Sequence, residues 1–141
     1  MPTSVETWAV DTSVAVAALD GGHAAHRACR DVVLAHRPAL AGHAAFETFS
    51  VITRMPGQLA VDASVAADVI DRLFPERCCI DAAAAHALVS RCGSLGIRGG
   101  AVYDALVGEA ARAAGCRLLT RDLRARRTYD VLGVYYEPVG L

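Results

Sequence analysis

The chain has 141 residues, of which 54% are hydrophobic and 21% charged, and its formal net charge is −1. This length is expected to form one domain over residues 1–141, and the near-zero charge excludes a basic field over the whole surface. No apolar run approaches the ~20 residues of a membrane span, and the N-terminus lacks the pattern of a secretion signal, so a cytoplasmic protein without a membrane anchor is expected.

Strand and helix patterns alternate along the chain. Short apolar runs predict strands at about 8–10, 39–41, 78–80, 116–120 and 133–136. Helical spacing predicts helices at about 14–19, 23–35, 43–54, 62–74, 82–92, 101–114 and 123–127. Two of these helices have predicted apolar stripes, Ala45, Phe49 and Ile52 in the third and Val65, Val69 and Leu73 in the fourth. The alternation predicts an α/β fold, a parallel sheet with helices on both faces.

Acidic residues stand at four comparable places in this pattern. Asp11 directly follows the first predicted strand, and Asp122 comes three residues after Leu119 in the fourth. Glu47 lies one turn into the helix after the second strand, and Asp104 lies in the first turn of the helix that leads into the fourth. Functional residues gather outside the carboxyl ends of parallel strands. The four acids therefore meet at one edge if the first and fourth strands are neighbours.

The four acids have both a structural and a chemical interpretation. An aspartate between a strand and a helix is often only an N-cap, and Asp11 or Thr12 is a plausible cap here. Glu47 and Asp104 instead lie in apolar helices, where an unpaired carboxylate is costly. A bound cation compensates that cost, and carboxylate oxygens suit Mg²⁺ or Mn²⁺. The pattern therefore indicates four metal-binding catalytic acids, Asp11, Glu47, Asp104 and Asp122.

The basic residues are all arginine, fourteen in number, and the chain has no lysine. Several cluster around Asp122, and four of them are candidates for RNA contact: Arg121, Arg124, Arg126 and Arg127. An arginine-rich genome and a solvated face explain the cluster as well. The missing lysine excludes receiver domains, haloacid-dehalogenase phosphatases and Walker-loop proteins, whose sites each use one.

Four motifs together resemble the PIN-domain family, and more narrowly the VapC-type toxins of bacterial toxin–antitoxin pairs. They are D-T-S from Asp11, E-T-F-S-V-I-T-R-M-P from Glu47, Y-D-A-L-V around Asp104 and L-L-T-R-D ending at Asp122. The resemblance covers the whole chain and implies a PIN domain with a five-stranded parallel sheet. It also implies an endoribonuclease that depends on Mg²⁺, with Mn²⁺ able to substitute, and the four acids as its metal ligands. Ser13 and Thr120 match small polar residues that support the family's site.

The resemblance further implies a homodimer, a cognate VapB-type antitoxin, and a structured RNA substrate such as tRNA or rRNA. Many relatives have another acid after the fourth, where this chain has Leu123 and Arg124. The sequence therefore leaves open whether the site binds one metal ion or two. The motifs contain no histidine or lysine base, which favours attack by water at a metal site. The alternative is a PIN-like binding module with little or no turnover, held in a permanent protein or RNA complex. Neutralising one acid is expected to abolish cleavage without destabilising the metal-free protein.

Overall fold

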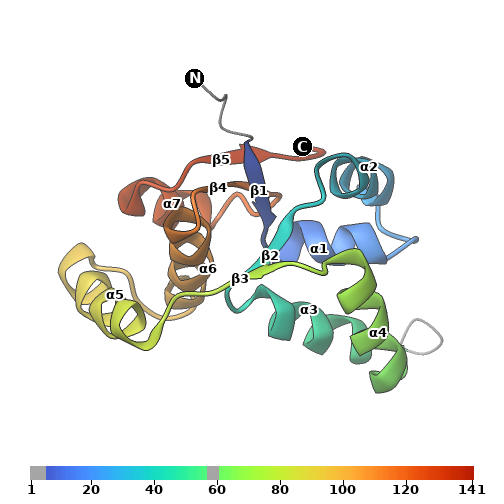
Figure 1. The fold of residues 1–141 in the computed structure, drawn as a ribbon, viewed down its shortest axis with the longest axis horizontal. Helices are drawn as coiled ribbons and strands as arrows, with labels where there is room; N and C mark the ends of the chain where they lie inside the picture. Colours follow the sequence, from blue (N-terminus) through green and yellow to red (C-terminus); the bar gives the residue numbers. More distant parts are fainter. Residues whose placement is uncertain (1–5, 57–60) are drawn as a thin grey trace.

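A central parallel sheet organises the molecule. The computed structural model describes residues 6–56 and 61–141, and Figure 1 shows the strands between two groups of helices. The five strands lie in the order β3-β2-β1-β4-β5, and every neighbouring pair is parallel. Their bounds are β1 Thr7–Val10, β2 Ala39–Ala41, β3 Arg77–Cys78, β4 Cys116–Thr120 and β5 Tyr136–Pro138. The predicted α/β fold is confirmed.

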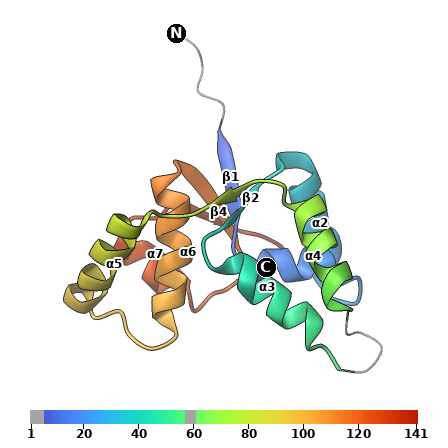
Figure 2. The same cartoon turned by 60° about the horizontal axis from the view of Figure 1, so that its bottom comes forward.

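Helices connect the strands and return the chain to the same end of the sheet, as parallel pairing requires. Their bounds are α1 Thr12–Leu19, α2 His26–His36, α3 Ala44–Thr53, α4 Ala63–Leu73, α5 Ala82–Leu95, α6 Ala101–Ala113 and α7 Arg126–Leu132. Figures 1 and 2 agree that α1 to α4 lie together on one side and α5 to α7 on the other. Within residues 6–56 and 61–141, no helix is both long and apolar enough to span a bilayer.

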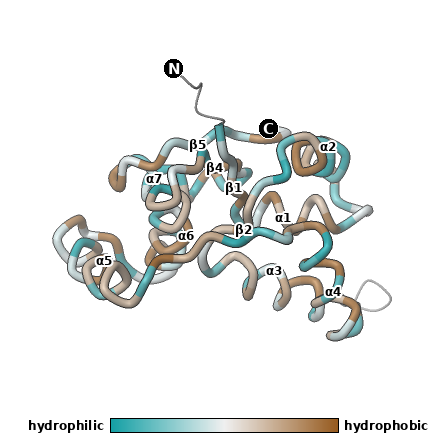
Figure 3. Tube along the Cα trace, in the orientation of Figure 1, coloured by the Kyte–Doolittle hydropathy of each residue, from teal (hydrophilic) through white to brown (hydrophobic). Residues whose placement is uncertain are grey.

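The core lies where the two helical groups meet the sheet. In Figure 3, α1 is apolar along most of its length, whereas α4 alternates between polar and apolar residues. The central strands are buried toward their carboxyl ends, at Ala9 and Val10 in β1 and at Leu118 and Leu119 in β4. Parallel strands covered on both faces are expected to be apolar at consecutive positions, which explains these runs.

Strand β1 lies between β2 and β4, so the carboxyl ends of these three strands stand side by side. Val10 is opposite Leu40 on one side and opposite Leu119 on the other. The backbone N–H of Asp11 continues the ladder and donates to the carbonyl of Leu119 at 3.3 Å. The first and fourth strands are therefore neighbours, which is the condition that the sequence left open for a meeting of the four acids.

The C-terminal elements differ from the prediction. The helix predicted at 123–127 is wrong, because α7 begins only at Arg126. Before it, the side chain of Asp122 accepts two backbone N–H groups and holds the chain in a turn. Gly133 ends α7 with a φ of +73°, a conformation that glycine adopts readily. The last strand therefore begins at Tyr136 and not at residue 133.

The apolar face of α4 is rotated from the one predicted, whereas in α3 the predicted Ala45 and Ile52 are buried and only Phe49 is not. Phe49 of α3 is 36% exposed, and Val65 and Val69 of α4 are 48% and 38% exposed. In α4 the neighbouring stripe of Ala66 and Ile70 is buried instead. Both stripes have the same helical spacing, so periodicity alone does not choose between them. The outward valines leave α4 with apolar side chains on its exposed side.

Gly108 allows α6 and α7 to pack closely. A Cβ at this position would lie 2.9 Å from Cδ1 of Tyr129 and 3.0 Å from Cγ2 of Val134. We expect Gly108→Ala to lower the free energy of unfolding by about 1 kcal/mol. Overpacking destabilises by about 1–3 kcal/mol, and the better helix propensity of alanine offsets about 1 kcal/mol of that loss. Urea unfolding measures the effect. Gly93→Ala in α5 is the control, since a Cβ there meets no atom within 4 Å, and an equal loss in both variants would contradict the packing argument.

Candidate active site

One small cavity brings the four predicted acids together. It has a volume of about 40 Å³ and is lined by Asp11, Thr12, Ser13, Glu47, Asp104, Val107, Asp122 and Tyr129. Asp11 comes from the end of β1 and Asp122 from the loop after β4, whereas Glu47 and Asp104 come from the first turns of α3 and α6. The volume is enough for roughly two or three water molecules, so the cavity admits an ion or water but not a nucleotide.

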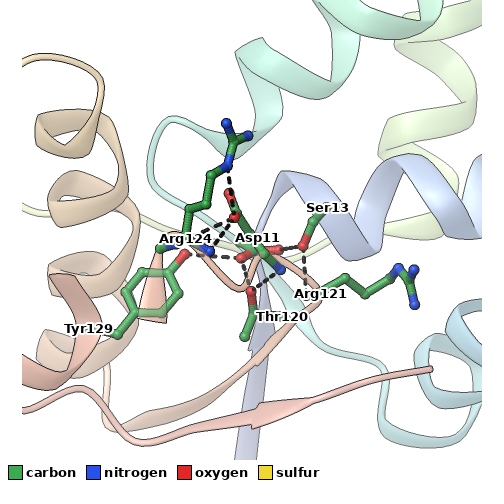
Figure 4. Close-up of polar contacts among 8 residues, drawn as sticks. Asp11, Ser13, Thr120, Arg121, Arg124 and Tyr129 are labelled. Carbon is green, nitrogen blue, oxygen red and sulfur yellow. Dashed lines mark hydrogen bonds and ion pairs between the residues drawn. The ribbon is translucent and has the colours of Figure 1, made fainter. Parts of the chain in front are cut away.

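Asp11 lies at the centre of the site and is 4% exposed (Figure 4). Its Oδ1 accepts hydrogen bonds from the Ser13 hydroxyl at 2.5 Å and from the Val14 backbone N–H at 3.4 Å. Its Oδ2 accepts from the Thr120 hydroxyl at 2.5 Å and from the Tyr129 hydroxyl at 3.0 Å. The bond from Val14 makes Asp11 the N-cap of α1, as one interpretation of the sequence expected. The other three donors are not needed for capping.

The two short hydroxyl contacts have a defined direction. The Ser13 oxygen accepts the N–H of Arg121 at 2.8 Å, and the Thr120 oxygen accepts the N–H of Asp122 at 3.1 Å. Both hydroxyl hydrogens therefore point to Asp11. Burial raises the pKa of Asp11, while its four hydrogen bonds oppose that change. A protonated Asp11 would lose an acceptor site, so the surrounding groups are arranged for its ionised form.

The pKa values of Asp104 and Glu47 are also raised. Burial, together with the charges of the other three acids, raises the pKa of Asp104 to about 6. Burial also raises the pKa of Glu47, which nearby His43 opposes. These shifts are the signature of negative charges crowded into a partly dry site.

Basic side chains do not neutralise this cluster. In residues 6–56 and 61–141, no ion pair involves Asp11, Glu47 or Asp104. Asp122 has one long contact, 3.9 Å from Nε of Arg124, whose side chain is 96% exposed. Such a pair is worth little in solvent. Within the described part of the chain, the cluster therefore carries negative charge that is only weakly compensated, by the exposed Arg124.

The donor chemistry of the cavity fits a hard divalent cation. Carboxylate oxygens with room for water are the ligands that Mg²⁺ and Mn²⁺ prefer. As the side chains lie, however, no three histidine, cysteine, aspartate or glutamate groups of the described chain are close enough to hold one ion. Binding thus requires the half-buried Glu47, Asp104 and Asp122 to turn toward Asp11, whose own position is set by its hydrogen bonds.

The four candidate arginines lie in different surroundings. The guanidinium of Arg121 points away from Asp11 in Figure 4 and donates to the backbone carbonyls of Val139 and Gly140. Arg126 lies over an aromatic ring of β5, and Arg127 lines another cavity between α5, α6 and α7. Arg124 is the member of the set that lies beside the acids.

Tyr129 is the site residue that sequence patterns missed. It is 118 residues from Asp11 and only 1% exposed, and its spacing in the chain is that of an ordinary core aromatic. Its ring is indeed part of the core, but its hydroxyl reaches the acid cavity. The residues next to it in the chain, Arg127, Thr128 and Asp130, give no local signal of that contact.

Comparison with known proteins shows which family this chain is similar to. Residues 9–131 match the PIN domain. The chain is 43% identical over 130 residues to Ribonuclease VapC27 of Mycobacterium tuberculosis, covering 90% of this chain and 93% of that protein. It is 42% identical over 132 residues to Ribonuclease VapC40 of the same species, covering 93% and 98%.

Solved structures share the fold at lower sequence identity. Mycobacterium tuberculosis VapC20, described as a sarcin–ricin loop cleaving toxin, has a TM-score of 0.66 and 21% identity, covering 91% of this chain and 96% of that chain. VapBC2 from Rickettsia felis, solved with a DNA fragment from its promoter, has a TM-score of 0.66 and 12% identity, covering 94% and 98%. These likenesses concern the backbone arrangement alone.

Proposed function

The chain belongs to the PIN-domain family and, within it, to the VapC ribonucleases, and on this basis we propose that it is a Mg²⁺-dependent endoribonuclease toxin. Its substrate is a structured RNA such as tRNA or rRNA, and a cognate VapB-type antitoxin neutralises it in the cytoplasm. The names of the 43% and 42% identical relatives support the ribonuclease activity. Residues 1–141 act as a single PIN domain in this proposal.

The observation that carries the proposal is the convergence of four acids on one cavity, three of which have no ion-pair partner among the described residues. Asp11, Glu47, Asp104 and Asp122 line it together, and Ser13 and Thr120 support Asp11. A purely structural role does not explain why two helices and two strand ends direct carboxylates to one point, because like charges repel. A divalent cation relieves this repulsion, and Mn²⁺ is expected to replace Mg²⁺.

The proposed reaction is hydrolysis of a phosphodiester by water. A bound Mg²⁺ would be held by the four acids and would stabilise the charge that develops on the phosphate. The water oxygen bonds to phosphorus as the bond from phosphorus to the 3′ oxygen breaks, which leaves a 3′-hydroxyl and a 5′-phosphate. One carboxylate of the cluster would accept the proton that the water loses, and the departing 3′ oxygen takes up a proton from solvent.

Two groups beside the cavity are suited to hold RNA. The exposed side chain of Arg124 extends near Asp122 and offers a contact to backbone phosphate, which positions RNA without reading its sequence. The ring of His43 stacks on Tyr103 at 5.2 Å and lies 5.8 Å from the ring of Phe46. Phe46 and Tyr103 are 72% and 53% exposed, which leaves faces on which unpaired bases can stack.

The proposed partners are the antitoxin and a second copy of the chain. Support for the antitoxin comes from membership of the VapC group and from the shared fold with VapBC2. An antitoxin segment with a basic residue would complement the negative cavity. We propose a homodimer for the toxin on the ground of family membership alone.

A specific observation favours the alternative of a binding module with little or no turnover. The acids of the described residues do not form a ready coordination cage, and both oxygens of Asp11 already accept hydrogen bonds. Under that alternative the chain binds a partner or RNA through the same surface. Metal-dependent turnover separates the two functions.

Cleavage by the antitoxin-free protein should require a divalent cation. We expect discrete fragments from total tRNA or rRNA with Mg²⁺ or Mn²⁺, and no cleavage when EDTA is in excess. Without a cation, the negative acids have nothing with which to stabilise the charge on the phosphate. Gel analysis with end mapping measures the products and their termini. Cleavage that persists in EDTA would exclude the proposed chemistry, whereas Mn²⁺ binding without cleavage of any RNA class would favour the binding module.

A further inference from the structure

Tyr129 brings a hydroxyl group to Asp11 from α7, outside the sheet. Its hydroxyl oxygen lies 3.0 Å from Oδ2 of Asp11, and Figure 4 shows the side chain directed at that carboxylate. The residue also lines the cavity that holds the four acids. The proposed function gives Tyr129 no role, although it is one of four donors to the most buried acid.

Packing, and not the hydroxyl, holds the ring of Tyr129 in place. One edge lies against Gly108, where a Cβ would approach to 2.9 Å, and the ring of Tyr136 lies 5.7 Å away. The backbone N–H of Tyr129 donates to Ala125, and its carbonyl accepts the N–H of Val134, both at 3.0 Å. The hydroxyl is therefore held at a fixed point that does not depend on Asp11.

The hydroxyl of Tyr129 differs from those of Ser13 and Thr120. Those two also accept backbone N–H groups and so tie the chain after β4 to the site. Among the described residues, the only polar contact of the Tyr129 hydroxyl is Asp11. Phenylalanine would fill the same space in the core, so ring packing does not account for the hydroxyl.

We propose that Tyr129 is a positioning residue for divalent-cation binding, because its hydroxyl fixes Oδ2 of Asp11 and so orients that carboxylate toward the other acids. The inference rests on the proposed function, since it presupposes that Asp11 is a metal ligand. Oδ2 is the more firmly held oxygen, with bonds from Thr120 at 2.5 Å and Tyr129 at 3.0 Å. Oδ1 accepts from Ser13 at 2.5 Å and only weakly from Val14 at 3.4 Å, so it keeps more capacity for another partner than Oδ2 does.

Tyr129→Phe tests the proposal because it removes only the hydroxyl. We expect its dissociation constant for Mn²⁺ to rise about tenfold, at the lower end of the effect of losing a group that orients a ligand. Mn²⁺ is the probe, and electron paramagnetic resonance of the antitoxin-free protein counts the free ion. Cleavage at saturating Mn²⁺ should show a lower kcat with an unchanged KM for RNA, since the hydroxyl faces Asp11 and not the exposed RNA surface.

Tyr136→Phe is the matched control, since the hydroxyl of Tyr136 donates to Asp130 on the exposed side of α7. Its Mn²⁺ affinity and kcat should stay within about twofold of the parent. The proposal is overturned if Tyr129→Phe binds Mn²⁺ like the parent, or if both variants lose affinity equally, which would indicate loosening of the C-terminal region. A parent protein that binds no Mn²⁺ would reject the proposed function together with this inference, so the two failures are distinguishable.

Discussion

Replacing Asp11 by asparagine should lower the rate of RNA cleavage by at least about a thousandfold, equivalent to about 4 kcal/mol of transition-state stabilisation. Asparagine keeps the shape and is as good an N-cap as aspartate, so α1 should still form. It lacks the negative charge and the second carboxylate oxygen that a metal ligand needs. Single-turnover cleavage of a mapped RNA, at equal protein and metal concentrations, measures the loss.

Asp81→Asn provides a control with the same chemical change. Asp81 caps α5 by accepting the N–H of Ala84 at 2.7 Å, and it is exposed and outside the acid cavity. This variant should cleave like the parent. Full activity of Asp11→Asn would remove Asp11 from the catalytic site, whereas equal losses in the two variants would indicate damage to helix capping in general.

The hydrogen bonds of Asp11 change one expectation drawn from the sequence. Neutralising an acid was expected to leave the metal-free protein as stable as before. The structure indicates instead that Asp11→Asn lowers the free energy of unfolding by about 1–3 kcal/mol. The amide nitrogen of asparagine must face the hydroxyl of Ser13 or Thr120, whose hydrogen already points toward residue 11. Relief of charge repulsion offsets part of this cost. The activity test therefore requires proof of folding by circular dichroism.

Asp104→Asn should stabilise the metal-free protein at pH 7 while it abolishes cleavage. Burial and three neighbouring carboxylates raise the pKa of Asp104 from 3.8 to about 6, so the folded state binds this proton more tightly than the unfolded chain. The contribution of Asp104 to the free energy of unfolding consequently falls as pH rises from about 4 to about 6 and remains low above that. Asparagine removes this penalty.

We expect the stability advantage of Asp104→Asn to grow by about 1–2 kcal/mol from pH 4.5 to pH 7. A shift of about two pKa units corresponds to ~3 kcal/mol, but the half-buried side chain is partly screened by solvent. Urea unfolding in EDTA at several pH values measures the difference, and Asp68→Asn on the exposed side of α4 is the control. A variant less stable than the parent at pH 7 would mean that Asp104 has a favourable partner and is not part of a repulsive cluster.

Local sequence signals were sufficient to find the four acids and the framework that carries them. Asp11 and Asp122 follow short apolar runs, and a parallel sheet places the ends of such runs at one edge. Glu47 and Asp104 were conspicuous because a carboxylate in an apolar helix needs a reason. The meeting itself depended on β1 lying between β2 and β4, and strand order is a long-range property that no local pattern contains.

Local patterns did not show which side chains of the arginine-rich stretch and of α4 face solvent. Arg121 stands in the arginine-rich stretch beside Arg124, yet its guanidinium binds the carbonyls of the C-terminal segment. In α4, the stripe with Val65 and the stripe with Ala66 have identical spacing, and only packing against the rest of the fold buried the second. Periodicity reports that a helix has an apolar face, but two adjacent apolar stripes make its direction ambiguous.

The sequence by itself thus determined the α/β architecture and the acidic residues, because strand alternation, helix spacing and isolated charges are read from near neighbours. Only the tertiary structure decided how Asp11 is held. Its donors Thr120 and Tyr129 are 109 and 118 residues away, and they reach it because β4 pairs with β1 and Gly108 lets α7 approach α6. A hydrogen bond between residues so distant in the chain is a consequence of the whole packing, and no short segment of sequence encodes it.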